Sequence, residues 1–231
     1  MTIKRTFAGN FSGGNSASLK YLDHSTGAPG CNHRWLATRQ SPADGATLTS
    51  FAPSVGTLPL TADGTSPIMQ TDEYGNRCIR FDGVDDILSA SGLADVQTIV
   101  VVARVKAATG TDQGVVHAGG AYINRTTTDG TRVLVTGQSA KFPAVNPNQP
   151  KYHVFSLAAN GSTSRYAIDG TSAEVGATTG VLSQITLGRA STSIFGNLDV
   201  YEVFTYPTGL TLGDMTSIRA AMSARYGTAL A

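Results

Sequence analysis

The stretch that decides the fold is GNRCIRFDGVDDIL, residues 75–88. Ile79 and Phe81 alternate with polar neighbours, which is typical of a β-strand with one face in a core. The Asp82-Gly83 pair favours a turn, because glycine adopts positive φ and aspartate bonds nearby backbone N–H groups. Ile87 and Leu88 begin another apolar run. The stretch therefore predicts a strand, a turn and a second strand.

The same stretch carries three aspartates, Asp82, Asp85 and Asp86, which could instead form a calcium loop. Calcium takes about six to eight oxygen ligands. The loop offers three carboxylates and some carbonyls, and nothing elsewhere in the chain identifies the missing ligands. We therefore predict turn chemistry and no metal, with calcium as the alternative, and no cofactor.

Turn signals recur along the chain and separate short β-branched or aromatic runs. Asp-Gly occurs at 44–45, 63–64, 82–83, 129–130 and 169–170, and Asn-Gly at 160–161. The runs predict strands at 97–106, 152–159, 163–169, 184–189 and 197–207. The first is apolar on both faces, as in a strand covered on both sides. Residues 152–175 predict two successive hairpins.

One segment, residues 210–227, predicts a helix over 211–226. Its apolar residues recur every three or four positions, which places them in one stripe. They are Leu212, Met215, Ile218, Met222 and Tyr226. Thr211 with Asp214 fits an N-terminal capping box, and Gly227 fits a C-terminal stop. Strands followed by one helix predict an all-β fold, an antiparallel two-sheet β-sandwich with one C-terminal helix.

Residues 1–34 read as an extended arm and residues 35–231 as the sandwich. The arm is rich in Gly and Ser, and its few apolar residues are too irregular for a core. Residues 1–40 carry +4, whereas the whole chain carries +1. We expect the arm to anchor the protein to a neighbouring subunit, as a homo-oligomer or on another protein, by adding to a sheet edge. Alternatively, residues 18–24 supply an edge strand of the same sandwich.

Composition argues against several classes of protein. The net charge of +1 gives no reason to expect nucleic acid. No apolar run predicts a membrane span or a secretory signal. Cys31 and Cys78 fit neither a zinc site nor a disulfide scaffold, so we expect two free and mostly buried thiols, with pairing as the alternative.

A search for catalytic groups finds no convincing set. Asp199 and Glu202 are three positions apart, so a regular strand points them to opposite faces, although a bulge could realign them. The four histidines, His24, His33, His117 and His153, lack metal-ligand spacing. We place His24 and His33 in the arm, and expect His117 and His153 to be strand residues with local partners. We predict no catalytic residues and no enzymatic activity.

Four aromatic residues near predicted loops are candidates for stacking on a sugar. They are Tyr74, Tyr122, Phe142 and Tyr152. Residues 141–152 contain three prolines and predict a long exposed loop suited to partner contacts.

Three motifs resemble those of the laminin-G-like, concanavalin A-like lectin and glucanase jelly rolls. They are GNRCIRFDGVDDIL, YHVFSLAANGSTSRYAIDGT and the segment from ITLGR to the terminal RYG, which occur in the family's order across residues 35–227. The resemblance implies two packed sheets with a shallow concave surface, a buried aromatic at Trp35, and a hydrogen bond from Glu202 near the terminal helix.

Bacteriophage minor tail and capsid decoration proteins also resemble this pattern, here in DGATLTSFAPSVG and the Gly-rich basic arm. That resemblance implies a non-enzymatic structural or binding module of the virion surface, with other virion proteins as partners and a cell-surface glycan as a further ligand. The alternative is a carbohydrate-active enzyme or its sugar-binding module.

Overall fold

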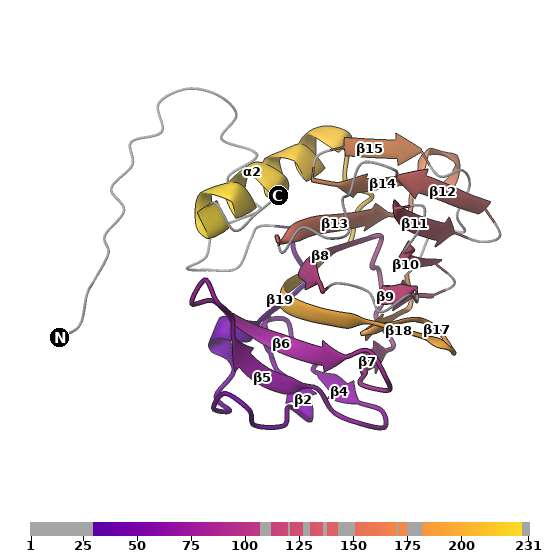
Figure 1. Cartoon of the computed structure of the whole chain (residues 1–231). Coiled ribbons are helices and arrows are strands. Elements are labelled where there is room, and N and C mark those ends of the chain that lie inside the picture. The colour runs from indigo at the N-terminus through magenta and orange to yellow at the C-terminus, as the bar shows by residue number, and fades with distance from the viewer. Residues whose placement is uncertain are drawn as a thin grey trace.

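Two antiparallel sheets and a helix outside them make up the described chain (Figure 1). The computed structural model describes residues 30–106, 112–119, 121–126, 130–135, 138–142, 151–169, 171–174 and 182–227. The predicted fold class, a two-sheet β-sandwich with a C-terminal helix, is confirmed.

The first sheet has nine strands. In spatial order, seven of them are β15 (Thr171–Glu174), β14 (Arg165–Ile168), β13 (His153–Ala158), β8 (Thr98–Val105), β19 (Asn197–Tyr206), β1 (His33–Leu36) and β3 (Pro53–Val55). β6 (Arg77–Asp82) also pairs with β19, and β5 (Ile68–Thr71) pairs with β6. The β13–β14–β15 meander confirms the two predicted hairpins.

The second sheet has eight strands. In spatial order they are β12 (Gln138–Phe142), β11 (Gly130–Val135), β10 (Ala121–Thr126), β9 (Gln113–Ala118), β16 (Gln184–Leu187), β7 (Leu88–Ser91), β4 (Leu60–Ala62) and β2 (Ser50–Phe51). A small separate pair joins β17 (Arg189–Ser191) to β18 (Ile194–Phe195), and 3-10 turns span Ala37–Arg39 and Gly161–Thr163.

The opening stretch carries the chain from one sheet to the other, since β6 belongs to the first sheet and β7 to the second. The backbone N–H of Val84 donates to Asp82 Oδ1 at 2.8 Å, and that of Asp82 to Asp86 Oδ2 at 3.0 Å. Gly83 has a φ of 85°, and a Cβ there would lie 2.9 Å from that of Asn197. The predicted turn chemistry is therefore confirmed.

The main core lies between the sheets. Trp35, Ile79 and Phe81 are fully buried in it, as predicted. The indole Nε1 of Trp35 donates to the carbonyl of Leu58 at 3.1 Å, which satisfies the buried donor. β8 is buried on both faces, because Val101 faces this core and Val100 faces the helix side. That double burial explains its continuous apolar sequence.

The helix α2 (Leu212–Tyr226) packs on the outer face of the nine-stranded sheet. Met215, Ile218 and Met222 are buried there, whereas Leu212 is 37% exposed, so the apolar stripe begins one turn later than predicted. Thr211 and Asp214 form the predicted capping box, and Gly227 caps the C-terminus. In Figure 1, β19 runs between α2 and the β5–β6 pair.

The sandwich begins earlier than predicted, since His33 and Arg34, assigned to the arm, belong to β1. Residues 1–29, and with them His24 and the alternative strand at 18–24, lie outside the described residues. The anchoring arm therefore stays a prediction.

Candidate functional site

A row of polar side chains crosses the outer face of the eight-stranded sheet. Cross-strand pairing aligns Ser50, Thr61, Ser89, Thr186, His117 and Tyr122, in that order. Their strand neighbours, including Phe51, Leu187 and Ile123, point into the core, so alternation turns these six outward. We call this set the hydroxyl row.

The row ends in an imidazole and a phenol. Gln184 lies beside His117, and its side-chain Nε2 contacts His117 Nδ1 at 3.0 Å. Burial, with a smaller contribution from the charge of Arg189, lowers the pKa of His117. The ring is therefore neutral at pH 7, and because the amide donates to Nδ1, the ring proton lies on Nε2.

This arrangement fits recognition of a hydroxyl-rich ligand. Hydroxyl groups both donate and accept hydrogen bonds, the imidazole donates from Nε2, and a tyrosine ring offers an apolar face to stack on. Ser50 and Thr61 are exposed, Ser89, His117 and Tyr122 are half-buried, and Thr186 is only 4% exposed. The row is thus open to solvent at both ends.

The four aromatic candidates for sugar stacking differ in their exposure. Tyr74 is 44% exposed, and Tyr122 lies in the hydroxyl row. Tyr152 is fully buried, so the prediction of a stacking surface there is wrong. Its hydroxyl is held by Asp72, and its ring packs 4.1 Å from that of Tyr201. The side chain of Phe142 and residues 143–150 of the predicted loop lie outside the described part.

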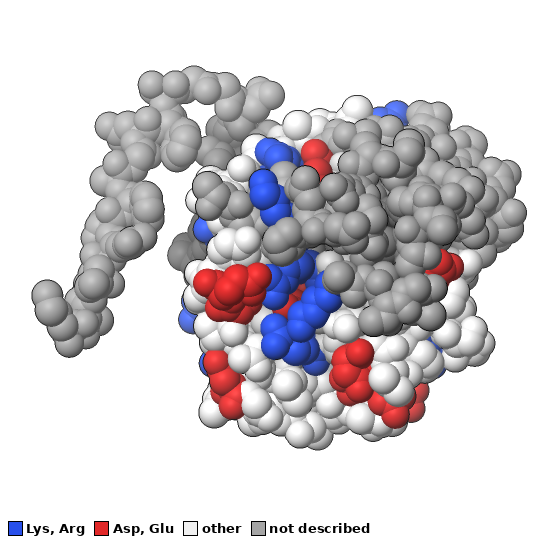
Figure 2. Space-filling model, in the orientation of Figure 1, with Lys and Arg blue, Asp and Glu red and all other residues white. Residues whose placement is uncertain are grey.

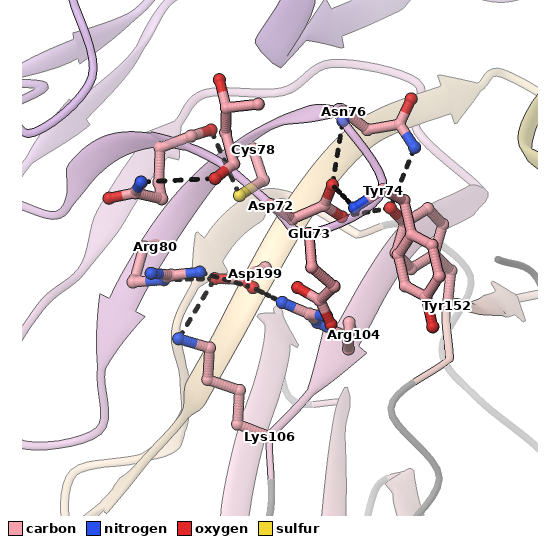
Figure 3. A network of polar contacts seen from close by, with 12 residues as sticks. Asp72, Glu73, Tyr74, Asn76, Cys78, Arg80, Arg104, Lys106, Tyr152 and Asp199 are labelled. Carbon is pink, nitrogen blue, oxygen red and sulfur yellow. Dashed lines mark hydrogen bonds and ion pairs between the residues drawn. The ribbon is translucent and has the colours of Figure 1, made fainter.

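A second polar arrangement occupies the outer face of the nine-stranded sheet (Figure 3). Asp199 on β19 is fully buried and accepts from Arg80 Nε at 2.8 Å and from Arg104 Nη2 at 2.6 Å. Lys106 Nζ lies 3.6 Å from the same carboxylate. We call Arg80, Arg104 and Lys106 the basic cluster.

The electrostatics of Asp199 follow from these neighbours. Burial alone would raise its pKa, but hydrogen bonds from Arg80 and Arg104 and the charge of Lys106 outweigh burial and lower the pKa. Asp199 is therefore a permanent counter-ion at neutral pH.

The β5–β6 turn adjoins the basic cluster. Asp72 Oδ1 accepts the backbone N–H groups of Tyr74 at 3.0 Å and Asn76 at 2.9 Å, which fixes the turn. Its Oδ2 accepts the hydroxyls of Tyr152 and Tyr201. From this turn Glu73 reaches back to form an ion pair with Arg104.

Asp199 and Glu202 share one face, so the prediction of opposite faces is wrong. The pairing of β19 with β8 shifts between Val200 and Glu202. Leu198, Val200 and Val203 face the inter-sheet core, whereas Tyr201 and Phe204 face the helix side. This bulge takes up one residue and turns Glu202 outward with Asp199.

The shared face does not make the two carboxylates an acid pair. Glu202 accepts from Arg34 at 3.4 Å and from Arg225 at 2.5 Å, and its Oε1 also accepts the hydroxyl of Tyr226 at 2.6 Å. The contacts with Arg225 and Tyr226 confirm the hydrogen bond expected near the terminal helix. The lowered pKa of Asp199 disfavours the protonated form that a general acid needs. Glu202 is fully buried, and its two oxygens are occupied by Arg34, Arg225 and Tyr226.

The three aspartates of the opening stretch lie close together. Ligand oxygens of Asp82, Asp85 and Asp86 lie within 4.8 Å of one another. Burial raises the pKa of Asp86, and the nearby charges of Asp82 and Asp85 add to the increase. Two of the oxygens already accept backbone N–H groups of the turn.

Adding millimolar calcium, or a chelator, is expected to leave the melting temperature within about 1 °C of its starting value, because a ligand that does not bind the folded state cannot stabilise it. Differential scanning calorimetry measures this. A rise of several degrees that disappears in Asp85→Asn would establish a calcium site instead.

Both cysteines are free, as expected. Burial raises the pKa of Cys31 to about 11 and that of Cys78 to about 12. At pH 8 the thiolate fraction is then on the order of one in a thousand or less.

Native protein is therefore expected to react slowly with a thiol reagent at pH 8. Protein unfolded without reductant is expected to react at once, with two thiols per chain. Cys31→Ser provides the control, with one equivalent. Fewer than two equivalents from the unfolded wild type would indicate a disulfide.

The described histidines have local contacts. His153 contacts Asp169 at 2.5 Å, and His117 contacts Gln184, so both have the predicted local partners. His33 stacks on Trp35 with ring centroids 5.4 Å apart. Among the described residues, no helix is both long and apolar enough to cross a membrane.

The sequence matches no known protein-family profile and no curated protein. Solved structures do share the fold. A Trypanosoma rangeli sialidase in complex with sialic acid matches with a TM-score of 0.65 at 12% identity, over 87% of this chain and 34% of the sialidase chain. The receptor-binding domain of a botulinum neurotoxin C/D mosaic serotype matches with a TM-score of 0.60 at 10% identity, over 85% of this chain and 52% of that domain.

These matches show that the two-sheet β-sandwich fold is shared, and nothing finer. The chain spans about a third of the sialidase and about half of the neurotoxin domain.

Proposed function

We propose that this protein is a non-enzymatic binding module that holds a glycan against the outer face of its eight-stranded sheet. The observation that carries the proposal is the hydroxyl row, where aligned hydroxyls run into His117 and Tyr122. Concave or flat faces with a few placed polar groups and an aromatic ring suit small polar ligands. The shared fold with a sialidase solved with sialic acid, and with a receptor-binding domain, agrees with a binding role.

The binding role is favoured over glycoside hydrolysis by the state of the carboxylates. Retaining hydrolysis needs two carboxyl groups about 5–5.5 Å apart, one of them able to carry a proton. Asp199 and Glu202 are buried and their oxygens are occupied by arginines, so neither is free to contact a sugar.

A glycan array probed with the full chain tests the proposal. We expect retention of at least one neutral oligosaccharide, and a loss of about tenfold or more in affinity in Tyr122→Ala and in His117→Ala, because each removes a side-chain contact at the aromatic end of the row. Val84→Ala, at a side chain 67% exposed and outside the row, is the matched control and should bind as the wild type does.

The same oligosaccharide should be recovered intact after incubation, as measured by reducing-end detection. Cleavage that Glu202→Gln abolishes would show that the protein is a carbohydrate-active enzyme. Unchanged binding in both row variants would show that the site lies elsewhere.

For its biological setting we propose the surface of a bacteriophage virion, as a minor tail, tail-tip or capsid decoration protein. The support is the sequence resemblance in DGATLTSFAPSVG and the basic, Gly-rich residues 1–34, which suit attachment to neighbouring virion subunits. Mass spectrometry of purified particles tests this: the protein should be present at a fixed copy number, and its absence would exclude a virion role.

A further inference from the structure

The basic cluster gathers three cations around one fixed counter-ion. Arg80, Arg104 and Lys106 converge on the single buried carboxylate of Asp199. Figure 2 shows Lys and Arg side chains gathered near the centre of this face, with Asp and Glu beside them. The side chains of Arg80 and Lys106 are 27% and 28% exposed, so the cluster reaches the surface.

The second counter-ion of the cluster, Glu73, is held in a different way. Its side chain is 54% exposed, and its carboxylate meets Arg104, whose side chain is only 6% exposed. The hydrogen bond from Arg104 lowers the pKa of Glu73. Since Asp72 fixes the backbone of the turn, Glu73 can leave Arg104 by a change of rotamer alone.

Arg104 has an unsatisfied donor. Its Nε is buried and has no hydrogen-bond partner among the described residues. A buried N–H without a partner costs free energy, so a water or ligand oxygen that accepts from it would stabilise this position.

An aromatic ring stands next to this position. Tyr74 follows Glu73 in the turn, is 44% exposed, and packs edge-on against Tyr152 with ring centroids 5.8 Å apart. Sugar rings stack their C–H faces on such aromatic rings, whereas an acidic peptide needs only the cations.

We propose that the basic cluster binds the carboxylate of an acidic saccharide, which takes the place of the Glu73 carboxylate on Arg104 while the sugar ring packs on Tyr74. The proposal extends the glycan-binding function to a second site on the opposite sheet. Asp199 serves as a positioning residue, because it holds the three cations together without itself contacting the ligand. Glu73 acts as a competing internal carboxylate.

Calorimetric titration of the full chain with trimers of galacturonate, mannuronate and guluronate tests the proposal. At least one trimer should bind, and its methyl ester, which lacks the charge, should not. Lys106→Gln and Arg80→Gln should each weaken binding by about tenfold. Tyr74→Ala should weaken it too.

Glu73→Gln gives the sharpest readout. If the Glu73–Arg104 ion pair were only structural, removing the Glu73 charge would not strengthen the binding of a ligand. This variant should bind the trimer about threefold or more tightly, by removing the internal competitor. Arg189→Gln, a partly exposed cation on β17 outside the cluster, is the control and should bind as the wild type does.

Three results would overturn the proposal: no binding of any trimer by the wild type and Glu73→Gln, equal binding of the methyl ester, or tighter binding of triglutamate, which would identify an acidic peptide as the ligand. The hydroxyl row is tested separately, because Tyr122→Ala should leave uronate binding intact and Lys106→Gln should leave neutral-glycan binding intact. Either binding site can therefore be disproved without affecting the evidence for the other.

Discussion

Replacing Asp199 with asparagine is expected to lower the free energy of unfolding by about 3–5 kcal/mol, the usual cost of removing one partner from a buried ion pair. Asparagine keeps the shape of the side chain but removes the charge that faces Arg80, Arg104 and Lys106. Arg80 and Lys106 are partly exposed and can turn toward water. Arg104 cannot, because its side chain is 6% exposed.

Urea denaturation of wild type and variant measures the change in unfolding free energy. The dependence of that free energy on urea concentration should be the same in both proteins. Asp63→Asn, at an exposed position in a turn, is the control and should change stability by less than about 0.5 kcal/mol. Because the folded-state pKa of Asp199 is lowered, its contribution is present at neutral pH and is lost as the pH falls below the ordinary value of 3.8. A loss below about 1 kcal/mol at pH 7 would show that the ion pairs are compensated by solvent.

Replacing Ile218 with alanine is expected to cost about 2–5 kcal/mol, because a fully buried isoleucine leaves a cavity when truncated. Ile218 packs with Met215 and Met222 against the outer face of the nine-stranded sheet. The same denaturation experiment applies.

Leu212→Ala is the matched control within the same helix. Leu212 belongs to the same sequence stripe but is 37% exposed, so its truncation should cost less than about 1 kcal/mol. Equal effects at the two positions would show that α2 is not docked through its Met215–Met222 face.

The fold could be predicted because its signals are local. Alternation placed Ile79 and Phe81 in the core, the continuous apolar run of residues 97–106 indicated a strand covered on both faces, and Thr211 with Asp214 marked the start of the helix. Each of these patterns depends on neighbours within a few residues, which is the range over which sequence determines local structure.

The sites could not be predicted, because they depend on distant pairing. The bulge near Tyr201 has no local signal, and it alone brings Glu202 to the face of Asp199. Asp199 meets Arg80 across 119 positions and Arg104 across 95. Tyr152 follows a proline-rich segment, and this context indicated an exposed residue. Contacts with Asp72 and Tyr201, which are distant in sequence, bury it instead.

The hydroxyl row could be predicted in part. Alternation on each strand identifies Thr61, Ser89 and Thr186 as outward residues. Only the register across strands aligns them with His117 and Tyr122, and a slip of one residue would turn each of them inward. The aromatic end of the row was therefore found as a candidate, whereas its hydroxyls were not.

The most direct measurement of the binding role is an amide NMR titration of the full chain with a neutral oligosaccharide retained on the array. Binding at the hydroxyl row predicts saturable shifts at Ser89, His117, Tyr122 and Thr186, with the nine-stranded sheet unaffected and the oligosaccharide intact at the end of the titration. Shifts confined to Asp199, Glu202 and their arginines, together with new reducing ends, would contradict it.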